Sequence, residues 1–224
     1  AFDCLSGCSA GSVIAALLAC GVSAQRMEEI ALHINESALF DVTASKRGFI
    51  KGERFESFLK TLTADRAFCD LDIPLCIVAT DYCNARCAYF ETGDPEKLYR
   101  GVHASCAIPG VFVPVACRNT QMLDGGLITR LPIDECRRLG ADVVIGVDVS
   151  FSGGTLAVGN VLDIITNSME ILQYEVAKLR RREDDLVLTP RVQHYDVLRV
   201  RNQHTLIEEG RAAVRENIDR IRAA

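Results

Sequence analysis

Apolar runs and amphipathic segments alternate along the chain, and this alternation predicts its secondary structure. Near-continuous apolar stretches at residues 73–81 and 141–150 are typical of strands buried on both faces. Shorter strands are predicted at residues 1–7, from residue 87, on both sides of a polar turn at 118–120, and at 184–190. Helical spacing predicts helices at residues 10–20, 25–34, 53–62, 132–139, 160–182 and 204–222, and one more that begins at Asp94 and Pro95. Helices that alternate with buried strands indicate an α/β fold with a mainly parallel sheet.

The predicted helix at residues 160–182 is the longest in the chain. Its apolar residues fall on one stripe, made of Leu162, Ile165, Met169, Leu172, Val176 and Leu179. Basic residues gather at its end (Lys178, Arg180, Arg181 and Arg182), and acidic residues follow directly. This mixture favours a solvated helix end over a patch that binds anionic lipid, so any membrane contact is expected to be peripheral.

Length and composition predict one domain over residues 1–224. The chain has no internal repeat, low-complexity tract or linker rich in proline and serine. Its net charge is -5, and acidic and basic residues are interspersed. Nucleic acid is therefore not expected as a partner, because phosphate binding needs a basic stripe. The oligomeric state stays open.

Ten cysteines could suggest a secreted protein held by disulfides, but their positions favour reduced thiols. Six of them lie in apolar stretches, where a free cysteine behaves as a small hydrophobic residue. Cys83 and Cys87 form a lone C-x3-C pair, for which a turn with two thiols is favoured over a metal site. The longest apolar run, residues 13–22, is about half of what a membrane span requires. We expect a cytoplasmic protein, although a chain that starts at Ala1 leaves targeting segments open.

A G-x-S-x-G pattern at the first predicted strand and helix is the leading candidate for chemistry. Gly7, Ser9 and Gly11 place one serine in a sharp turn between strand and helix. Glycines on both sides would remove clashes in such a turn, and the helix N-terminus would direct N–H groups toward charge that develops at the serine. The alternative is a tight crossover with no chemical role.

A nucleophilic serine needs a base, and the histidines do not supply an evident one. The four are His33, His103, His194 and His204. None lies in the sequence context of a catalytic triad, and a lone histidine is more often structural. His103, close to apolar segments, is kept only as a minor candidate.

Three aspartates, Asp81, Asp124 and Asp148, lie where predicted strands end. Sites in open α/β sheets form at the carboxyl ends of strands. Asp124 stands out because Gly125 and Gly126 follow it and allow a tight turn and close approach of another element. Asp81 and Asp148 are interpreted as residues that cap or end strands.

Four segments together resemble the patatin-like phospholipases, in particular their small bacterial members. They read SGCSAGS, ASCAIPGVFVPV, LDGG and LGADVVIGVDV, and the likeness extends from Phe2 to Arg222. The resemblance implies a three-layer α/β sandwich and a Ser–Asp dyad in which Ser9 is the nucleophile and Asp124 the general base. It further implies a lipid acyl ester as substrate, an acyl-enzyme that water hydrolyses, and no metal or organic cofactor.

One feature of the family has no counterpart in the printed chain. Members carry a glycine-rich loop, G-G-G-x-R-G, after a strand that precedes the nucleophile, and its N–H groups form the oxyanion hole. Because the chain starts at Ala1, we expect a domain without that strand and loop, with oxyanion donors unassigned. Two alternatives to a lipid hydrolase stay open. One is a catalytically silent lipid-binding or regulatory module of the same fold, and the other is a hydrolase of thioesters or small esters.

Overall fold

The computed structural model describes residues 2–34, 39–43, 45–149, 159–182, 185–192, 195 and 202–224. His194 and the acidic residues 183 and 184 lie outside this set, as does the last residue of the predicted strand at 141–150. All other predicted elements and site residues lie largely or wholly within it.

The central strand of the sheet is β2 (Leu75–Asp81), in which every residue is buried. One edge of β2 is occupied by β3 (Arg86–Glu91), which runs antiparallel to it. The other edge is shared: β1 (Leu5–Cys8) pairs parallel with the first half of β2, and β5 (Thr120–Asp124) pairs antiparallel with the second half. A short β4 (Val115–Cys117) extends the sheet beyond β5.

The shared edge of β2 brings the carboxyl ends of β1 and β5 together. Cys8, the last residue of β1, pairs with Val78, and Asp124, the last residue of β5, pairs with Ala79. Because these partners are consecutive along β2, the two strands meet end to end. The residues that follow each strand, Ser9 and Gly125, therefore leave the sheet from the same point.

The predicted α/β class is confirmed, and the strand pairs within it are of both kinds. A second pair, β6 (Ile145–Val147) and β7 (Leu186–Leu188), is parallel like β1 and β2, whereas β3, β4 and β5 join through antiparallel pairs. The polar turn predicted between β4 and β5 is present. Arg118 and Asn119 both have positive φ, as a two-residue hairpin requires.

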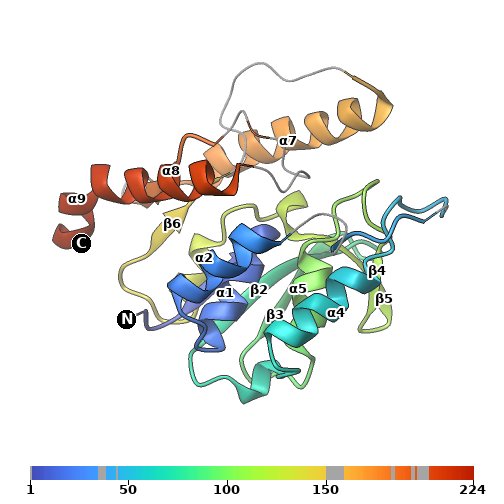
Figure 1. Ribbon diagram of the computed structural model, residues 1–224, viewed down its shortest axis with the longest axis horizontal. Coiled ribbons are helices and arrows are strands. Elements are labelled where there is room, and N and C mark those ends of the chain that lie inside the picture. Colours follow the sequence, from blue (N-terminus) through green and yellow to red (C-terminus); the bar gives the residue numbers. More distant parts are fainter. Residues whose placement is uncertain are drawn as a thin grey trace.

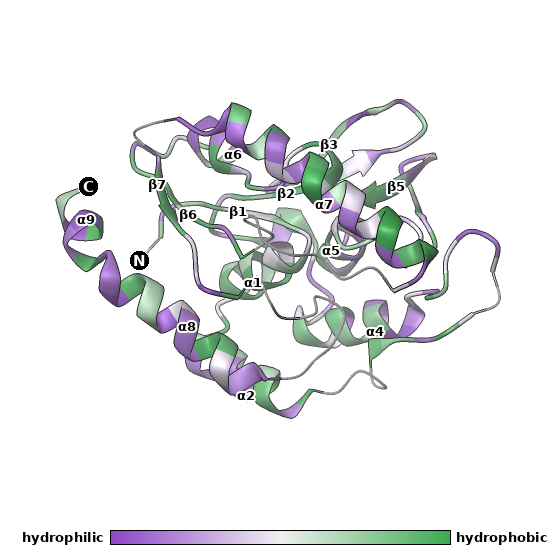
Figure 2. Ribbon diagram, turned by 90° about the horizontal axis from the view of Figure 1, so that it is seen from above, coloured by the Kyte–Doolittle hydropathy of each residue, from purple (hydrophilic) through white to green (hydrophobic). Residues whose placement is uncertain are grey.

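Helices cover both faces of the sheet and make three layers (Figures 1 and 2). On one face lie α1 (Ala10–Ala19), α4 (Glu53–Leu62) and α5 (Leu98–Ser105). On the other lie α6 (Ile133–Arg138) and α7 (Val161–Arg180). Figure 2, which is seen from above, shows β1 and β2 between the two groups. The three-layer sandwich implied by the resemblance is thus observed.

The main core lies under α1, α4 and α5. Ile77, Phe90 and Val102 are among its members with no exposed surface, and the ring of Phe68 in the 3-10 turn η1 (Phe68–Asp70) packs on that of Phe90. The buried face of α1 consists of small side chains. Ala15, Ala16 and Ala19 allow this helix to lie close to the strands.

The remaining helices lie at the periphery. α2 (Ala24–His33) contacts α8 (Gln203–Glu216), and Arg211 of α8 forms an ion pair with Glu28 of α2. The predicted C-terminal helix is interrupted at Asn217, after which α9 (Ile218–Ala223) follows. The predicted start of a helix at Asp94 is wrong. Asp94 instead accepts a hydrogen bond from the N–H of Glu96 in a turn, and α5 begins at Leu98.

The long helix α7 agrees with its predicted bounds, but none of its residues is buried. Leu172 and Leu179 on the predicted stripe are 66% and 87% exposed. Most basic residues near its end have polar partners: Lys178 pairs with Glu175, and Arg182 with Asp134 of α6. Among the residues that the structure describes, no helix is long and apolar enough to span a membrane.

Candidate active site

Ser9 occupies the turn between β1 and α1 in a strained conformation. Its φ of 50° and ψ of -129° lie outside the favoured regions for a residue with a side chain. The residue is partly exposed, and α1 begins directly after it. The first N–H groups of a helix lack partners within the helix, so positive potential develops beside Ser9. This is the arrangement expected of a nucleophile elbow.

The two glycines that flank Ser9 have different roles. At Gly7, an added Cβ would lie 2.6 Å from Cα of Ser12, which forces glycine there. The expectation that Gly11 also relieves a clash is wrong. Apart from its chain neighbours and the backbone of α1 itself, no heavy atom in the described part of the chain lies within 4 Å of a Cβ added at Gly11.

Both backbone groups of Ser9 are held by hydroxyl groups of buried serines. Its N–H donates to Oγ of Ser105 at 2.9 Å, and the Ser105 hydroxyl donates to the carbonyl of Val78 at 2.6 Å. Its carbonyl accepts from the N–H of Ser12 at 2.8 Å and from the Ser12 hydroxyl at 2.6 Å. Sequence reasoning singled out neither serine, although Ser105 lies within the ASCAIPG segment.

Asp124 ends β5 and is 5% exposed. Its N–H donates to the carbonyl of Ala107 at 2.9 Å, and its own carbonyl accepts from the Thr80 hydroxyl at 2.8 Å. On the side chain, Oδ1 accepts from the N–H of Gly126 at 2.7 Å. The carboxylate is therefore fixed in direction by a turn that belongs to its own motif.

The environment of Asp124 favours the protonated form more than water does. Burial raises the pKa of this carboxyl to about 6, while the Ser9 side chain and the Gly126 N–H act in the opposite direction. Ser9 thus lies close enough to influence the carboxylate, although no hydrogen bond of normal length joins the two side chains. Oδ2 is buried and has no hydrogen-bond partner among the residues described. A carboxylate with one fixed and one available oxygen is suited to accept a proton from a neighbour.

The glycines after Asp124 allow the close approach that the sequence predicts. A Cβ at Gly125 would lie 2.2 Å from the Val78 carbonyl oxygen, and one at Gly126 would lie 3.0 Å from Oδ1 of Asp124. Both glycines begin the 3-10 turn η2 (Gly125–Leu127), and at Gly125 this turn lies against β2 without room for a side chain.

Gly125→Ala is accordingly expected to lower the free energy of unfolding by about 3 kcal/mol, because its methyl group meets a backbone atom that cannot rotate away. Gly11→Ala is the matched control. It adds a methyl group to open space on a helix and should be neutral or stabilising by up to about 1 kcal/mol. Urea unfolding of both variants measures the difference, and equal stabilities would contradict the steric argument.

The other residues considered from sequence lie in structural environments. His103 is buried between Phe55 and Phe112, and its Nδ1 lies 2.9 Å from Oε2 of Glu56. Asp81 accepts hydrogen bonds from Thr120 at the start of β5 at 2.5 Å and from Asn84 in the β2–β3 turn at 2.8 Å, and these bonds lower its pKa. Asp148 pairs with Arg130. The structure brings none of these to Ser9.

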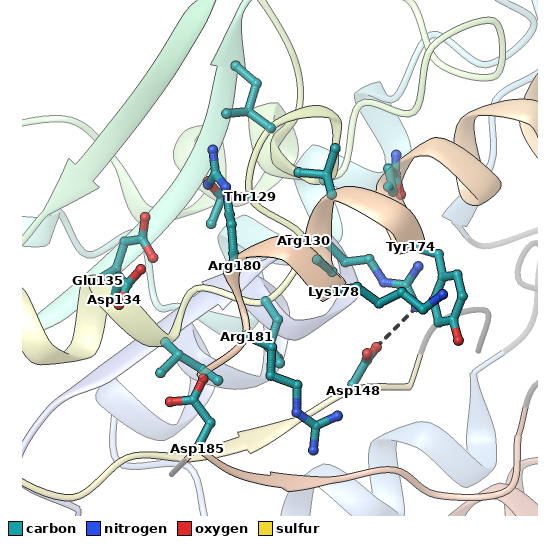
Figure 3. Close-up of a pocket in the computed structure, with 17 residues that line it drawn as sticks. Thr129, Arg130, Asp134, Glu135, Asp148, Tyr174, Lys178, Arg180, Arg181 and Asp185 are labelled. Carbon is teal, nitrogen blue, oxygen red and sulfur yellow. Dashed lines mark hydrogen bonds and ion pairs between the residues drawn. The ribbon is translucent and has the colours of Figure 1, made fainter. Parts of the chain in front are cut away.

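A cavity of about 90 Å³ lies beside the Asp–Gly–Gly turn, between α6, α7 and the segment that follows η2 (Figure 3). Gly126 lines it, but Ser9 and Asp124 do not. Charged and polar groups of its lining contact one another: Arg130 pairs with Asp148 at 3.2 Å, and Arg180 donates to Thr129 at 2.8 Å. These contacts hold α7 and the end of β6 against the segment that follows η2.

Metal ligands do not gather in the described parts of the chain. No group of three or more His, Cys, Asp or Glu residues could hold an ion there. All ten cysteines are free, and Cys83 is exposed in the turn before β3.

A known protein family matches the part of the chain that contains the candidate active site. The family model described as "Patatin-like phospholipase" matches residues 1–137, which include Ser9, Ser105 and Asp124. The chain belongs to the patatin-like phospholipase family. The resemblance read from the four sequence segments is thereby confirmed.

Relatives and a solved structure agree with this family. An uncharacterized NTE family protein of Mycobacterium tuberculosis is 29% identical over 155 residues, which cover 66% of this chain and 41% of that protein. Human patatin-like phospholipase domain-containing protein 6 is 31% identical over 156 residues, 66% of this chain but 11% of its own length. VipD of Legionella pneumophila shares the fold, with a TM-score of 0.63 at 12% identity over 96% of this chain and 61% of VipD.

Proposed function

We propose that this patatin-like chain is a serine acyl-ester hydrolase that acts on lipid esters through Ser9 and Asp124. The observation that carries the proposal is the meeting of a strained serine turn and a buried carboxylate at consecutive residues of β2. The family model, which covers both residues, supports the substrate class.

The chemistry follows from the geometry. Asp124 takes the proton of the Ser9 hydroxyl as Oγ attacks the ester carbonyl, and N–H groups at the start of α1 stabilise the negative charge on the carbonyl oxygen. The tetrahedral intermediate collapses, the C–O bond breaks, and Asp124 returns the proton to the leaving alcohol. Water, activated by the same carboxylate, then hydrolyses the acyl-enzyme and releases the fatty acid. No step requires a metal or an organic cofactor.

Site-specific labelling with a fluorophosphonate tests the nucleophile. We expect the probe to modify Ser9, as located by mass spectrometry, and Ser9→Ala to remove the modification. An unlabelled Ser9 in the full-length protein would overturn the proposal and favour the silent lipid-binding module.

Substrate class is tested separately from chemistry. For a lipid hydrolase, we expect kcat/KM on p-nitrophenyl esters to rise with acyl chain length, and phospholipid vesicles to be hydrolysed through peripheral contact. A rate that falls beyond short chains, or a preference for acyl thioesters, would instead favour a small-ester hydrolase or a thioesterase. Cytoplasmic location stays a prediction.

A further inference from the structure

Ser105 is a buried residue that contacts the backbone of the candidate nucleophile Ser9. It is the last residue of α5 and has no exposed surface. Its hydroxyl accepts from the N–H of Ser9 and donates to the carbonyl of Val78, so one side chain joins α5, the elbow and β2. A hydroxyl group has one proton to donate, and here both its donor and an acceptor site are used within the protein.

The segment that starts at Ser105 also holds the candidate base. Two residues further on, the carbonyl of Ala107 accepts the N–H of Asp124 at 2.9 Å. Residues 105–107 therefore contact the backbone of both Ser9 and Asp124. On the sheet side, Val78 receives the Ser105 hydroxyl, and its neighbour Ala79 pairs with Asp124.

The two backbone groups of Ser9 differ in how many bonds hold them. Its carbonyl has two donors, the N–H and the hydroxyl of Ser12. Its N–H has a single acceptor in the described structure, the Ser105 hydroxyl. Because Ser9 has a positive φ that a side chain disfavours, this single bond opposes relaxation of the turn.

We propose that Ser105 is a positioning residue that fixes the Ser9 hydroxyl relative to Asp124, an inference that rests on the proposed function. Loss of its hydroxyl releases the N–H of Ser9 and allows the elbow to relax away from the carboxylate. A displacement of about 1 Å between reacting groups can cost about a hundredfold in rate. Substrate binding is not affected, since Ser105 is buried and cannot reach the substrate.

The test measures kcat and KM on p-nitrophenyl butyrate and the rate constant of fluorophosphonate labelling. For Ser105→Ala we expect kcat and the labelling rate to fall by about ten- to a hundredfold, with KM within about twofold. Ser105→Cys fills nearly the same space with a weaker acceptor, so it preserves packing if the alanine variant fails to fold. It should lose about tenfold.

Two controls separate positioning from stability. Thr63→Val removes a hydroxyl that is also buried but binds the carbonyl of Leu59 in α4, so its rates should stay within about threefold of wild type. Leu98→Ala opens a core cavity at the opposite end of α5, which should lower the melting temperature but leave the rates nearly unchanged.

The outcomes distinguish the two proposals. Wild-type rates in Ser105→Ala or Ser105→Cys would overturn the positioning role, as would an equal loss of kcat in Leu98→Ala. A wild-type protein that is neither active nor labelled at Ser9 would instead overturn the proposed function itself, and the positioning role with it.

Discussion

Ser9→Ala is expected to reduce ester hydrolysis by on the order of ten thousandfold or more, because no other group can form the acyl-enzyme. The fold should persist. Alanine has the same backbone preferences as serine at φ 50°, and the hydrogen bonds to Ser105 and Ser12 come from the Ser9 backbone and not from its hydroxyl. Turnover of p-nitrophenyl butyrate, with the melting temperature measured in parallel, tests both statements.

Ser6→Ala is the matched control for this variant. Ser6 lies on the same strand, and its hydroxyl donates to the carbonyl of Pro132 at 2.6 Å on the α6 side. Loss of that bond should affect stability by about 1 kcal/mol and leave turnover near the wild-type level. Full activity in Ser9→Ala would eliminate the serine mechanism, while a joint loss in both variants would point to damage of β1.

Much of the candidate site could be predicted because its signals are local. The G-x-S-x-G pattern specifies a turn between a strand and a helix, and Gly125 and Gly126 specify a tight turn after Asp124. The contact between these two turns has no such local signal. It depends on β1 and β5 pairing with Val78 and Ala79 of one strand, and such register is set by contacts distant in sequence. Resemblance to a family supplied that link, whereas periodicity could not.

Features that depend on neighbours distant in the chain were predicted less well. Gly11 looked equivalent to Gly7 in the pentapeptide, yet only Gly7 faces a backbone atom of the next turn. Asp94 followed by proline is a good helix start by local preference, but its side chain caps a turn instead. No sequence pattern marks Ser105 or Ser12, because a buried serine has no local signature. Only the three-dimensional contacts show what its hydroxyl binds.

The kcat/KM of the wild type is expected to rise with pH through about 6 and then level off, because Asp124 must be ionised to act as base and burial raises its pKa to about 6. Asp124→Asn should lose nearly all turnover at every pH. Its amide oxygen can still accept the Gly126 N–H, so the turn should be retained. A rate profile that is flat from pH 5 to 8 would contradict Asp124 as the base.

The same substitution should stabilise the protein, with a definite dependence on pH. The folded state retains the Asp124 proton up to about pH 6, whereas an unfolded chain releases it near pH 4. Folding therefore binds a proton between these values, and the free energy of unfolding contributed by Asp124 falls as pH rises through this window. Above pH 6 the wild type bears the full cost of a buried charge that asparagine lacks.

Urea unfolding at pH 4 and pH 8 measures this cost. Asp124→Asn should exceed the wild type by on the order of 2–3 kcal/mol at pH 8, and the difference should shrink toward zero at pH 4. Asp81→Asn is a control with the opposite sign, because hydrogen bonds lower the Asp81 pKa and its charged form stabilises the fold above pH 4. If Asp124→Asn were no more stable than the wild type at pH 8, the charged carboxylate would not destabilise the fold as its burial implies. The proposed base would then be buried without cost to the fold.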